Sequence, residues 1–527
     1  MLFDVETPEG RAAFDRAPDA PFDVCVIGAG PAGITLARRL AARGLEVALM
    51  EGGGLEWSEE SQDLAVGESV GLTYPDLDAA RVRAFGGSSG HWNGLCRAFE
   101  AADMRPRPQN PGSGWPIGRE DLDPYAAETA LILDLVPDSD DMPETPPPAE
   151  PRAEDGFVRV WYLRSAPTRF GEKYLDELTA APRIALGVHA NLVDLRLDDT
   201  LATVEGAVFR GYGAGDEGFT VRAKSYCLCT GGFENPRLLL NFTSQAPAGI
   251  GNGNDLVGRF FADHVRMDVG EVILSAVPTA EVQFFTPTEG FLAEHRTLSI
   301  VLHLDYYDRK PLSLPKELAR SAQCTLPFGE RLVAAVAGDA LQCDRGGVGD
   351  WLASRDGEAN PWGRVVVNSE PGLNPESRVT LAEDRDALGL RRIRLDWRTL
   401  PIDDRTIRDT TLAFAGHLAD RDVGRVRLYD TVLAESPIRA TEPEQRLNGW
   451  HQMCTTRMSD DPATGVVDRD CKVFGIANLY VGGSSVFSTP GFQNPTYTIV
   501  QLALRLGDHL AETLPAGAAP APAGSDG

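Results

Sequence analysis

Three glycines near the amino terminus have the spacing that the phosphates of a dinucleotide require. Gly28, Gly30 and Gly33 form a G-x-G-x-x-G sequence, and Glu51 follows at the end of the next apolar run. Gly28 permits a tight turn, Gly30 lets the backbone approach a pyrophosphate, and Gly33 lets a helix pack close to a strand. The helix amino terminus then faces the phosphates, and the Glu51 carboxylate accepts hydrogen bonds from a ribose. The pattern predicts a nucleotide cofactor; a glycine-rich turn without a ligand is the structural alternative.

Further pairs of glycines lie far from this motif along the chain. They occur at Gly86-Gly87, Gly231-Gly232 and Gly482-Gly483. A cofactor as long as FAD needs contacts from several distant segments, so these turns favour FAD over NAD.

The elements that must position these glycines are visible as apolar runs. Residues 24–27 predict a buried strand, residues 34–44 a helix, and residues 47–50 the next strand, which together form a βαβ unit. The runs 225–229 and 479–481 also end in glycines, as sheet strands that meet a cofactor do. The central region carries no motif, and its alternating run 297–304 predicts a separate antiparallel sheet.

These elements predict an α/β fold, α+β overall, with a Rossmann-type FAD-binding domain and a substrate domain built on an antiparallel sheet. Residues 1–110, 185–265 and 446–515 are assigned to a discontinuous FAD-binding domain, residues 111–184 and 266–445 to the substrate domain, and residues 516–527 to a disordered tail. The acidic, proline-rich stretch 138–155 predicts an exposed loop.

Charge and cysteine usage limit the partners and the compartment. The 527 residues include 50 basic and 77 acidic side chains, a net charge of −27, which disfavours nucleic acid and anionic membranes. The sequence has no secretory leader and no apolar run long enough to span a membrane. The eight cysteines show no paired ligand spacing, which predicts a cytoplasmic protein without a metal site. Whether the chain forms an oligomer is left open.

Four stretches in order along the chain resemble the glucose–methanol–choline (GMC) oxidoreductase family. They are the glycine motif at 28–33, the loop GGSSGHWNG at 86–94, the segments 230–239 and 255–264, and the carboxy-terminal segments 451–458 and 491–496. The likeness is greatest to the pyranose oxidase-like sugar oxidoreductases of this family. It implies that FAD accepts a hydride from an alcohol carbon.

The resemblance also implies two catalytic residues, His451 and Asn494. An imidazole is suited to accept the hydroxyl proton near neutral pH, and an amide can donate a hydrogen bond to the alkoxide-like oxygen. Taken without the resemblance, a histidine such as His451 is more often a packed core residue than a base, and Asn494-Pro495 is typical of a turn.

His91 matches the position at which some members attach FAD covalently. The alternative is a histidine that hydrogen-bonds near the flavin without a covalent bond. The other residues predicted to contact the cofactor are Gly86, Gly87, Ser88, Trp92, Asn93, Gly231, Gly483 and Pro495. One departure from the family pattern is Cys454, which occupies a position that is usually glycine.

The predicted activity is the FAD-dependent oxidation of CH–OH to carbonyl on a sugar, glycoside, amino sugar or cyclitol, with oxygen or another molecule as electron acceptor. Trp115, Trp161 and Trp450 are candidate platforms for a pyranose ring. A GMC enzyme for an aromatic or aliphatic alcohol is the alternative, and a flavin-binding protein without catalysis is a more remote one.

Overall fold

The computed structural model describes residues 1–137, 156–213, 217–276, 282–307, 361–442 and 446–514. The predicted loop at 138–155 and the predicted tail at 516–527 lie outside these residues.

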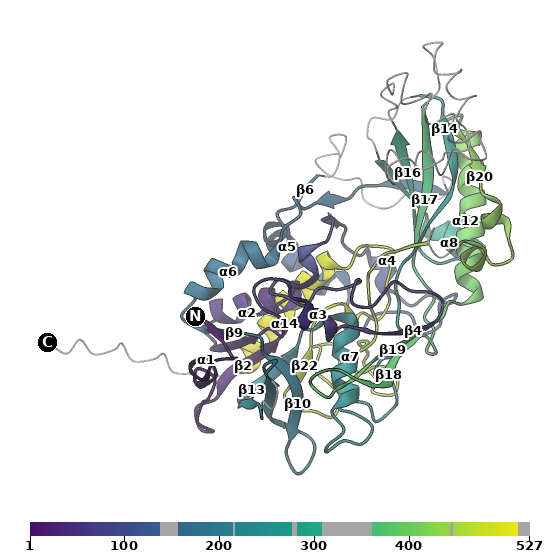
Figure 1. Ribbon diagram of the computed structural model, residues 1–527. Helices are drawn as coiled ribbons and strands as arrows, with labels where there is room; N and C mark the ends of the chain where they lie inside the picture. Colours follow the sequence, from purple (N-terminus) through teal and green to yellow (C-terminus); the bar gives the residue numbers. More distant parts are fainter. Residues whose placement is uncertain (138–155, 214–216, 277–281, 308–360, 443–445, 515–527) are drawn as a thin grey trace, which may run out of the picture.

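A six-stranded parallel sheet forms the base of the molecule (Figure 1). Its strands, in spatial order, are β1 (Leu2–Asp4), β9 (Ile184–Val188), β3 (Val47–Met50), β2 (Phe22–Ile27), β13 (Ala223–Leu228) and β22 (Leu479–Val481). Every residue of β2 and β3 is buried, as expected of strands covered on both faces. Helices α2 (Pro31–Ala42) and α14 (Thr496–Thr513) pack against each other beside this sheet. The predicted Rossmann-type unit is confirmed.

The second large sheet is antiparallel and stands apart from the first (Figure 1). Its strands are β20 (Gly424–Leu428), β14 (Val265–Leu274), β17 (Trp362–Ser369), β16 (Ile300–Tyr307), β15 (Val282–Pro287) and β7 (Phe157–Val160), with β21 (Arg446–Asn448) also paired to β14. The antiparallel sheet predicted from the alternating run 297–304 is therefore present.

The two faces of this sheet have different neighbours. Helices α12 (Pro401–Asp420) and α8 (Glu289–His295) cover one face, where Phe414 and Phe291 join the strand residues in one hydrophobic core. The opposite face carries a smaller apolar cluster that includes Tyr162, Phe284 and Phe492. Side chains on a strand alternate between the two faces of the sheet. The side chains on this second face can therefore form part of a binding site.

Smaller elements join the two large sheets. The short sheets are β18 (Arg378–Arg385), β19 (Arg391–Trp397) and β4 (Gly67–Gly71); β10 (Asn191–Leu197), β11 (Val204–Arg210) and β12 (Phe219–Val221); and β5 (Leu95–Cys96), β8 (Leu163–Arg164) and β6 (Val136–Pro137). The remaining α-helices are α1 (Pro8–Ala12), α3 (Glu59–Asp63), α4 (Ala101–Met104), α5 (Ala126–Ile132), α6 (Phe170–Ala180), α7 (Gly231–Asn241) and α13 (Pro437–Ala440).

The hydrophobic cores show how the segment 111–184 is packed. Residues 111–184 were assigned to the substrate domain, yet buried side chains of α5 and α6 belong to the core of the parallel sheet. The reason is that these helices are amphipathic and bury their apolar faces on the Rossmann layer, where Arg38 of α2 also pairs with Glu177 of α6 at 2.7 Å. Of this segment, β7 joins the antiparallel sheet.

The described parts of the chain contain no helix that is long and apolar enough to cross a membrane.

Candidate active site

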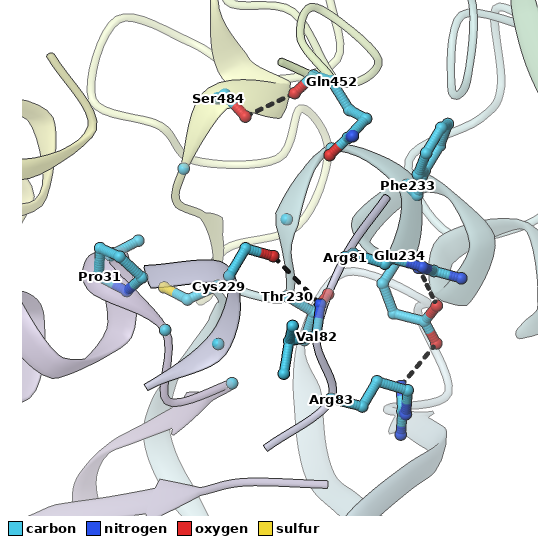
Figure 2. A pocket seen from close by; sticks show the side chains of 18 of the residues that line it. Pro31, Arg81, Val82, Arg83, Cys229, Thr230, Phe233, Glu234, Gln452 and Ser484 are labelled. Carbon is cyan, nitrogen blue, oxygen red and sulfur yellow. Dashed lines mark hydrogen bonds and ion pairs between the residues drawn. The ribbon is translucent and has the colours of Figure 1, made fainter. Parts of the chain in front are cut away.

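A cavity of about 520 Å³ begins at the carboxyl ends of β2, β13 and β22 and reaches the antiparallel sheet at Arg266. Figure 2 shows part of its wall, where Pro31 of α2, Thr230 after β13 and Ser484 after β22 surround one hollow. Of the residues predicted from the sequence, those that line the cavity are Gly28, Gly30, Glu51, Gly87, Ser88, His91, Trp92, Asn93, Gly231, His451, Gly483, Asn494 and Pro495.

The glycines of the first motif divide into two roles. Gly30 is the N-cap of α2 and provides no capping side chain, and a Cβ on it would meet nothing within 4 Å. Its surroundings leave room for a phosphate beside the helix amino terminus. Gly33 does not line the cavity, because a Cβ there would lie 1.8 Å from the Gly28 carbonyl oxygen. Gly33 therefore allows α2 to pack closely against the Gly28 turn. Gly30 leaves room for a phosphate to approach the helix amino terminus.

Glu51 holds the glycine loop in addition to facing the cavity. Its Oε2 accepts a hydrogen bond from the backbone N–H of Ala29 at 2.8 Å, and Oε1 accepts one from Gly53 at 2.8 Å. Burial raises the pKa of this carboxyl, and the two backbone donors oppose the rise. Each oxygen keeps a lone pair that a ribose hydroxyl can use.

The second glycine loop lies against the first. A Cβ on Gly87 would meet Gly30 Cα at 3.1 Å, so the two backbones approach closely. Gly86 has φ 93° and faces Gly171 of α6, at 2.5 Å from its would-be Cβ; unlike Gly87, it does not line the cavity. Gly86 thus provides a left-handed turn that packs against α6. Gly87 provides a position without a side chain beside the cavity.

His91 and Trp92 follow on this loop. Trp92 Nε1 donates to the carbonyl oxygen of Thr168 at 2.8 Å, which fixes the indole at the cavity wall. The His91 ring centre lies 5.8 Å from the Trp450 ring, and burial, with a smaller contribution from Arg169, lowers the pKa of His91. Asn93 lines the same wall and accepts a hydrogen bond from the backbone N–H of Leu95 at 3.2 Å.

Sequence reasoning did not single out Asn235, which joins the loops after β13 and β22. Its Oδ1 accepts from Thr230 N at 2.9 Å, and its Nδ2 donates to the Gly482 carbonyl oxygen at 3.1 Å and to Ser485 Oγ at 2.8 Å. This buried amide holds the glycine turns of two neighbouring strands together. Its place in the resembling segment 230–239 was the only available sign of this role.

Glu234, also missed, is the centre of a buried ion network in the same wall. It pairs with Arg81 at 2.9 Å and with Arg237 at 2.6 Å (Figure 2 shows its pairing with Arg81 and Arg83). Burial favours the neutral form of Glu234, but the neighbouring guanidinium groups outweigh it and lower the pKa to about 2. The loop at 81–83 is thereby tied to α7.

The predicted catalytic residues His451 and Asn494 line one cavity, although they come from different segments. Asn494 Nδ2 donates to the Leu95 carbonyl oxygen at 2.9 Å. This bond orients the amide and leaves its second N–H for another acceptor.

His451 is held from behind by a second histidine that sequence reasoning had not assigned a role. Its Nδ1 lies 2.9 Å from Nδ1 of His264, and His264 Nε2 lies 2.8 Å from the carbonyl oxygen of Gly491. A carbonyl oxygen only accepts, so His264 carries its proton on Nε2. Burial lowers the pKa of His264 to about 4, so the ring is neutral and its Nδ1 is an acceptor.

The same logic fixes the proton on His451. Because His264 Nδ1 accepts, His451 Nδ1 must donate, and the lone pair of neutral His451 is on Nε2. Burial, the His264 ring and Arg266 hold the pKa of His451 well below its ordinary value, which keeps this lone pair free near neutral pH. The arrangement gives the cavity an unprotonated imidazole nitrogen.

Asp263 fixes the backbone at the same point. Its Oδ1 accepts from His451 N at 2.9 Å, and its Oδ2 accepts from the Tyr74 hydroxyl at 2.7 Å. Burial raises the pKa of Asp263 to about 6. Asp263 and His264 thus both contact His451, although they lie far from it in the sequence.

Cys454 has a structural explanation. Its φ is 69°, in the left-handed region that glycine enters freely and other residues enter at a cost. The residue is completely buried, so its thiol fills space that a glycine would leave empty. The backbone path is the one that glycine favours.

The donor set fits FAD. An uncapped helix amino terminus, a glycine whose missing Cβ opens the wall, a buried acid beside it and loops from three strands surround one long cavity.

Comparisons with known proteins agree with this assignment. Residues 374–503 match the family described as GMC oxidoreductase. The chain is 25% identical to 2-methyl-1,2-propanediol dehydrogenase of Mycolicibacterium austroafricanum over 93% of this chain and 95% of that protein. It is 24% identical to paromamine 6'-oxidase of Streptomyces fradiae over 96% and 94%. Among solved structures, pyridoxine 4-oxidase from Mesorbium loti superposes with a TM-score of 0.57 at 17% identity, covering 93% of this chain and 99% of that one.

The chain thus resembles the GMC oxidoreductases, whose family model matches its residues 374–503. It is an FAD-dependent oxidoreductase that acts on alcohols.

Proposed function

We propose that this enzyme oxidises a CH–OH group of a carbohydrate-like alcohol, with His451 as the base and Asn494 as a hydrogen-bond donor to the reacting oxygen. FAD, when bound, accepts the hydride that leaves the substrate carbon. His451 Nε2 takes the hydroxyl proton as the C–H bond breaks, and the free N–H of Asn494 stabilises the negative charge on oxygen. The products are a carbonyl group, one proton on His451 and reduced flavin.

The observation that carries this proposal is the contact between His451 and His264. It leaves the lone pair on the nitrogen that a substrate in the cavity can reach, without a counter-charge that would hold a proton there. A protein that only stores flavin has no use for a base prepared in this way.

The carbohydrate class is supported by the cavity wall and by one relative. Trp92 and Trp450 both line the cavity and can stack on a sugar ring, and the similar paromamine 6'-oxidase is named for a sugar-like substrate. Trp115 is excluded from this role, because it is buried against Phe99 and Phe487 and does not line the cavity. The similar diol dehydrogenase keeps small aliphatic alcohols in the substrate panel.

The experiment is rapid anaerobic mixing of the FAD-loaded enzyme with sugars, cyclitols and aliphatic diols while flavin absorbance is recorded. With the best reductant, His451→Ala should lower the rate of flavin reduction on the order of 10²–10⁴-fold, the usual contribution of a positioned base. Asn494→Ala should lower it by about 10²-fold, because one donor is lost and the base remains. A His451→Ala enzyme that reduces its flavin at the wild-type rate refutes the assignment.

His417→Ala is the matched control. His417 lies on α12, which packs on the far face of the antiparallel sheet, and its ring contacts Phe157. This variant should keep its flavin and its rate of reduction.

A covalent bond between FAD and His91 has its own test. We propose that acid precipitation of wild type and of His91→Ala separates the two alternatives. Flavin that stays with the wild-type pellet and leaves the variant indicates a covalent bond, and flavin released from both indicates none. We further propose a cytoplasmic location, on the basis of cysteine usage alone.

A further inference from the structure

Arg266 extends the active site onto the antiparallel sheet. It follows His264 by two residues at the start of β14, and the ladder continues back to His264, whose carbonyl oxygen accepts from Gly449 N at 3.3 Å. Residues two apart on a strand face the same way, so Arg266 lies on the face whose His264 contacts His451. Arg266 lines the same cavity as His451 and Asn494.

The pairing of Arg266 differs from that of other arginines in the cavity wall. Across the parts of the chain that the structure describes, its side chain makes no hydrogen bond or ion pair, and its Nε is buried. By contrast, Arg81 and Arg237, which line the other end of the cavity, are both paired with Glu234. Partial burial of a guanidinium group without a partner costs free energy unless a ligand supplies hydrogen-bond acceptors for it.

Among the described residues, neither nearby carboxylate forms an ion pair with Arg266 at contact distance. Asp268, which shares the strand face, pairs with Arg364 at 2.9 Å, and Asp305 lies 4.0 Å from the same guanidinium. Opposite Arg266 in the strand register is Asn368, whose Nδ2 donates to the Phe492 carbonyl oxygen at 3.0 Å. Asp268 is thus directed to Arg364, whereas the positive charges of Arg266 and Arg364 both counteract the rise in the pKa of Asp305 that burial causes.

We propose that Arg266 binds a carboxylate of the substrate, so that the alcohol oxidised here is a hydroxy acid of the sugar-acid type. The planar guanidinium matches a carboxylate with two parallel hydrogen bonds, and its single charge balances a monoanion. An amino sugar would place a second positive charge beside Arg266 and is disfavoured. This inference rests on the proposed function for the identity of the alcohol, although the anion site itself does not depend on it.

The first experiment measures anion binding without turnover. FAD-loaded enzyme is titrated with acetate and, as a neutral match of the same shape, with acetamide, while the flavin spectrum is recorded. Acetate should perturb the flavin of wild type at concentrations at which acetamide does not. Arg266→Gln should weaken acetate binding about 10- to 100-fold, the fold-change that a charge-assisted hydrogen bond contributes.

Two further variants make this result specific. Arg266→Lys keeps the charge but not the paired hydrogen bonds, so it should bind acetate with intermediate strength. Arg427→Gln removes an exposed arginine of β20 that pairs with Glu271, and it should leave acetate binding unchanged. Equal binding of acetate by wild type and Arg266→Gln overturns the proposal. Inorganic phosphate is titrated in parallel, and a stronger effect than that of acetate would assign the site to a phosphate ester instead.

The second experiment compares turnover within matched sets. A neutral sugar, its uronic acid and its amino sugar are offered to the enzyme anaerobically. The uronic acid should have the highest kcat/KM, and Arg266→Glu should move the preference to the amino sugar. A preference of wild type for the neutral or amino member overturns the proposal. If no sugar reduces the flavin yet acetate binding still depends on Arg266, the proposed substrate class fails and the anion site stands.

Discussion

The cofactor side and the substrate side of the cavity are built by different means. On the parallel sheet, backbone forms an important part of the wall, at glycines 28, 30 and 87 and at an uncapped helix end. Toward the antiparallel sheet, the wall carries the side chains of Arg266 and His451, and His264 contacts His451 from behind across a separation of 187 residues. A wall formed by backbone selects a ligand mainly by shape. A wall formed by side chains can change its charge and hydrogen bonding through single substitutions.

This difference indicates which side of the cavity determines substrate specificity. The cofactor is common to many enzymes, and its site is encoded by local conformations that few residues satisfy. The substrate is particular to each enzyme, and its site depends on the charges that a sheet face presents. Variants on the two sides should therefore fail in different ways.

The largest effect is expected within the glycine motif itself. Gly33→Val should prevent correct folding, because its side chain would overlap the Gly28 carbonyl oxygen, already 1.8 Å from a Cβ. Gly30→Val should fold, since its Cβ points into open space, but it should not bind FAD because that space belongs to the pyrophosphate. Circular dichroism and the ratio of flavin to protein separate the two outcomes. Full flavin content in Gly30→Val would contradict the assignment of the cradle.

On the substrate side, His264→Phe should keep FAD but reduce flavin about 10- to 100-fold more slowly, because His451 Nδ1 loses the acceptor that fixes its proton. His264→Gln supplies an amide oxygen at a similar place and should recover part of the rate. The change should appear in kcat rather than KM, measured with saturating substrate.

His303→Phe is the control for this position. His303 is a buried histidine of the same sheet whose ring packs on Phe284, at 4.7 Å between ring centres, and it does not line the cavity. A slower rate in this variant equal to that of His264→Phe would show that His264 acts through packing alone.

The next effect concerns stability and pH. Burial lowers the pKa of His303 to about 3, so the native protein keeps this ring neutral while the unfolded chain protonates it below about pH 6.5. The unfolded state then binds more protons, and wild type loses stability as the pH falls. Relative to His303→Phe, the free energy of unfolding of wild type should fall by about 2 kcal/mol between pH 8 and pH 5. Urea unfolding of both proteins at the two pH values measures this difference. No change in it would mean that His303 is charged in the native protein.

The smallest effect is expected at Cys454. Cys454→Gly removes a buried thiol but relieves a left-handed backbone, so the two contributions oppose and the free energy of unfolding should change by less than about 1 kcal/mol. Cys227→Gly, at a buried strand position, has no strain to relieve and should destabilise more. Thermal unfolding compares the two variants. Equal losses would contradict the explanation offered for Cys454.

Much of the fold followed from local sequence. The βαβ unit, the strands at 225–229 and 479–481, and the antiparallel sheet around 297–304 were all predicted, because each depends on the period of its own apolar residues. Within the segment 111–184, helices α5 and α6 bury side chains in the core of the parallel sheet. The sequence shows that α5 and α6 are amphipathic, but not which of two sheets their apolar faces will cover.

The same distinction holds within the site. The glycine cradle and Glu51 could be predicted from local sequence, since turns, helix starts and backbone access are properties of neighbouring residues. The contact of His264 with His451, the hydrogen bond from the His451 backbone to Asp263 and the place of Arg266 in the cavity wall appeared only in the folded chain. Those facts depend on strand register and on the meeting of segments far apart along the chain. Hydrogen bonds and charge pairing are short-ranged, so they exist only after packing has brought the groups together.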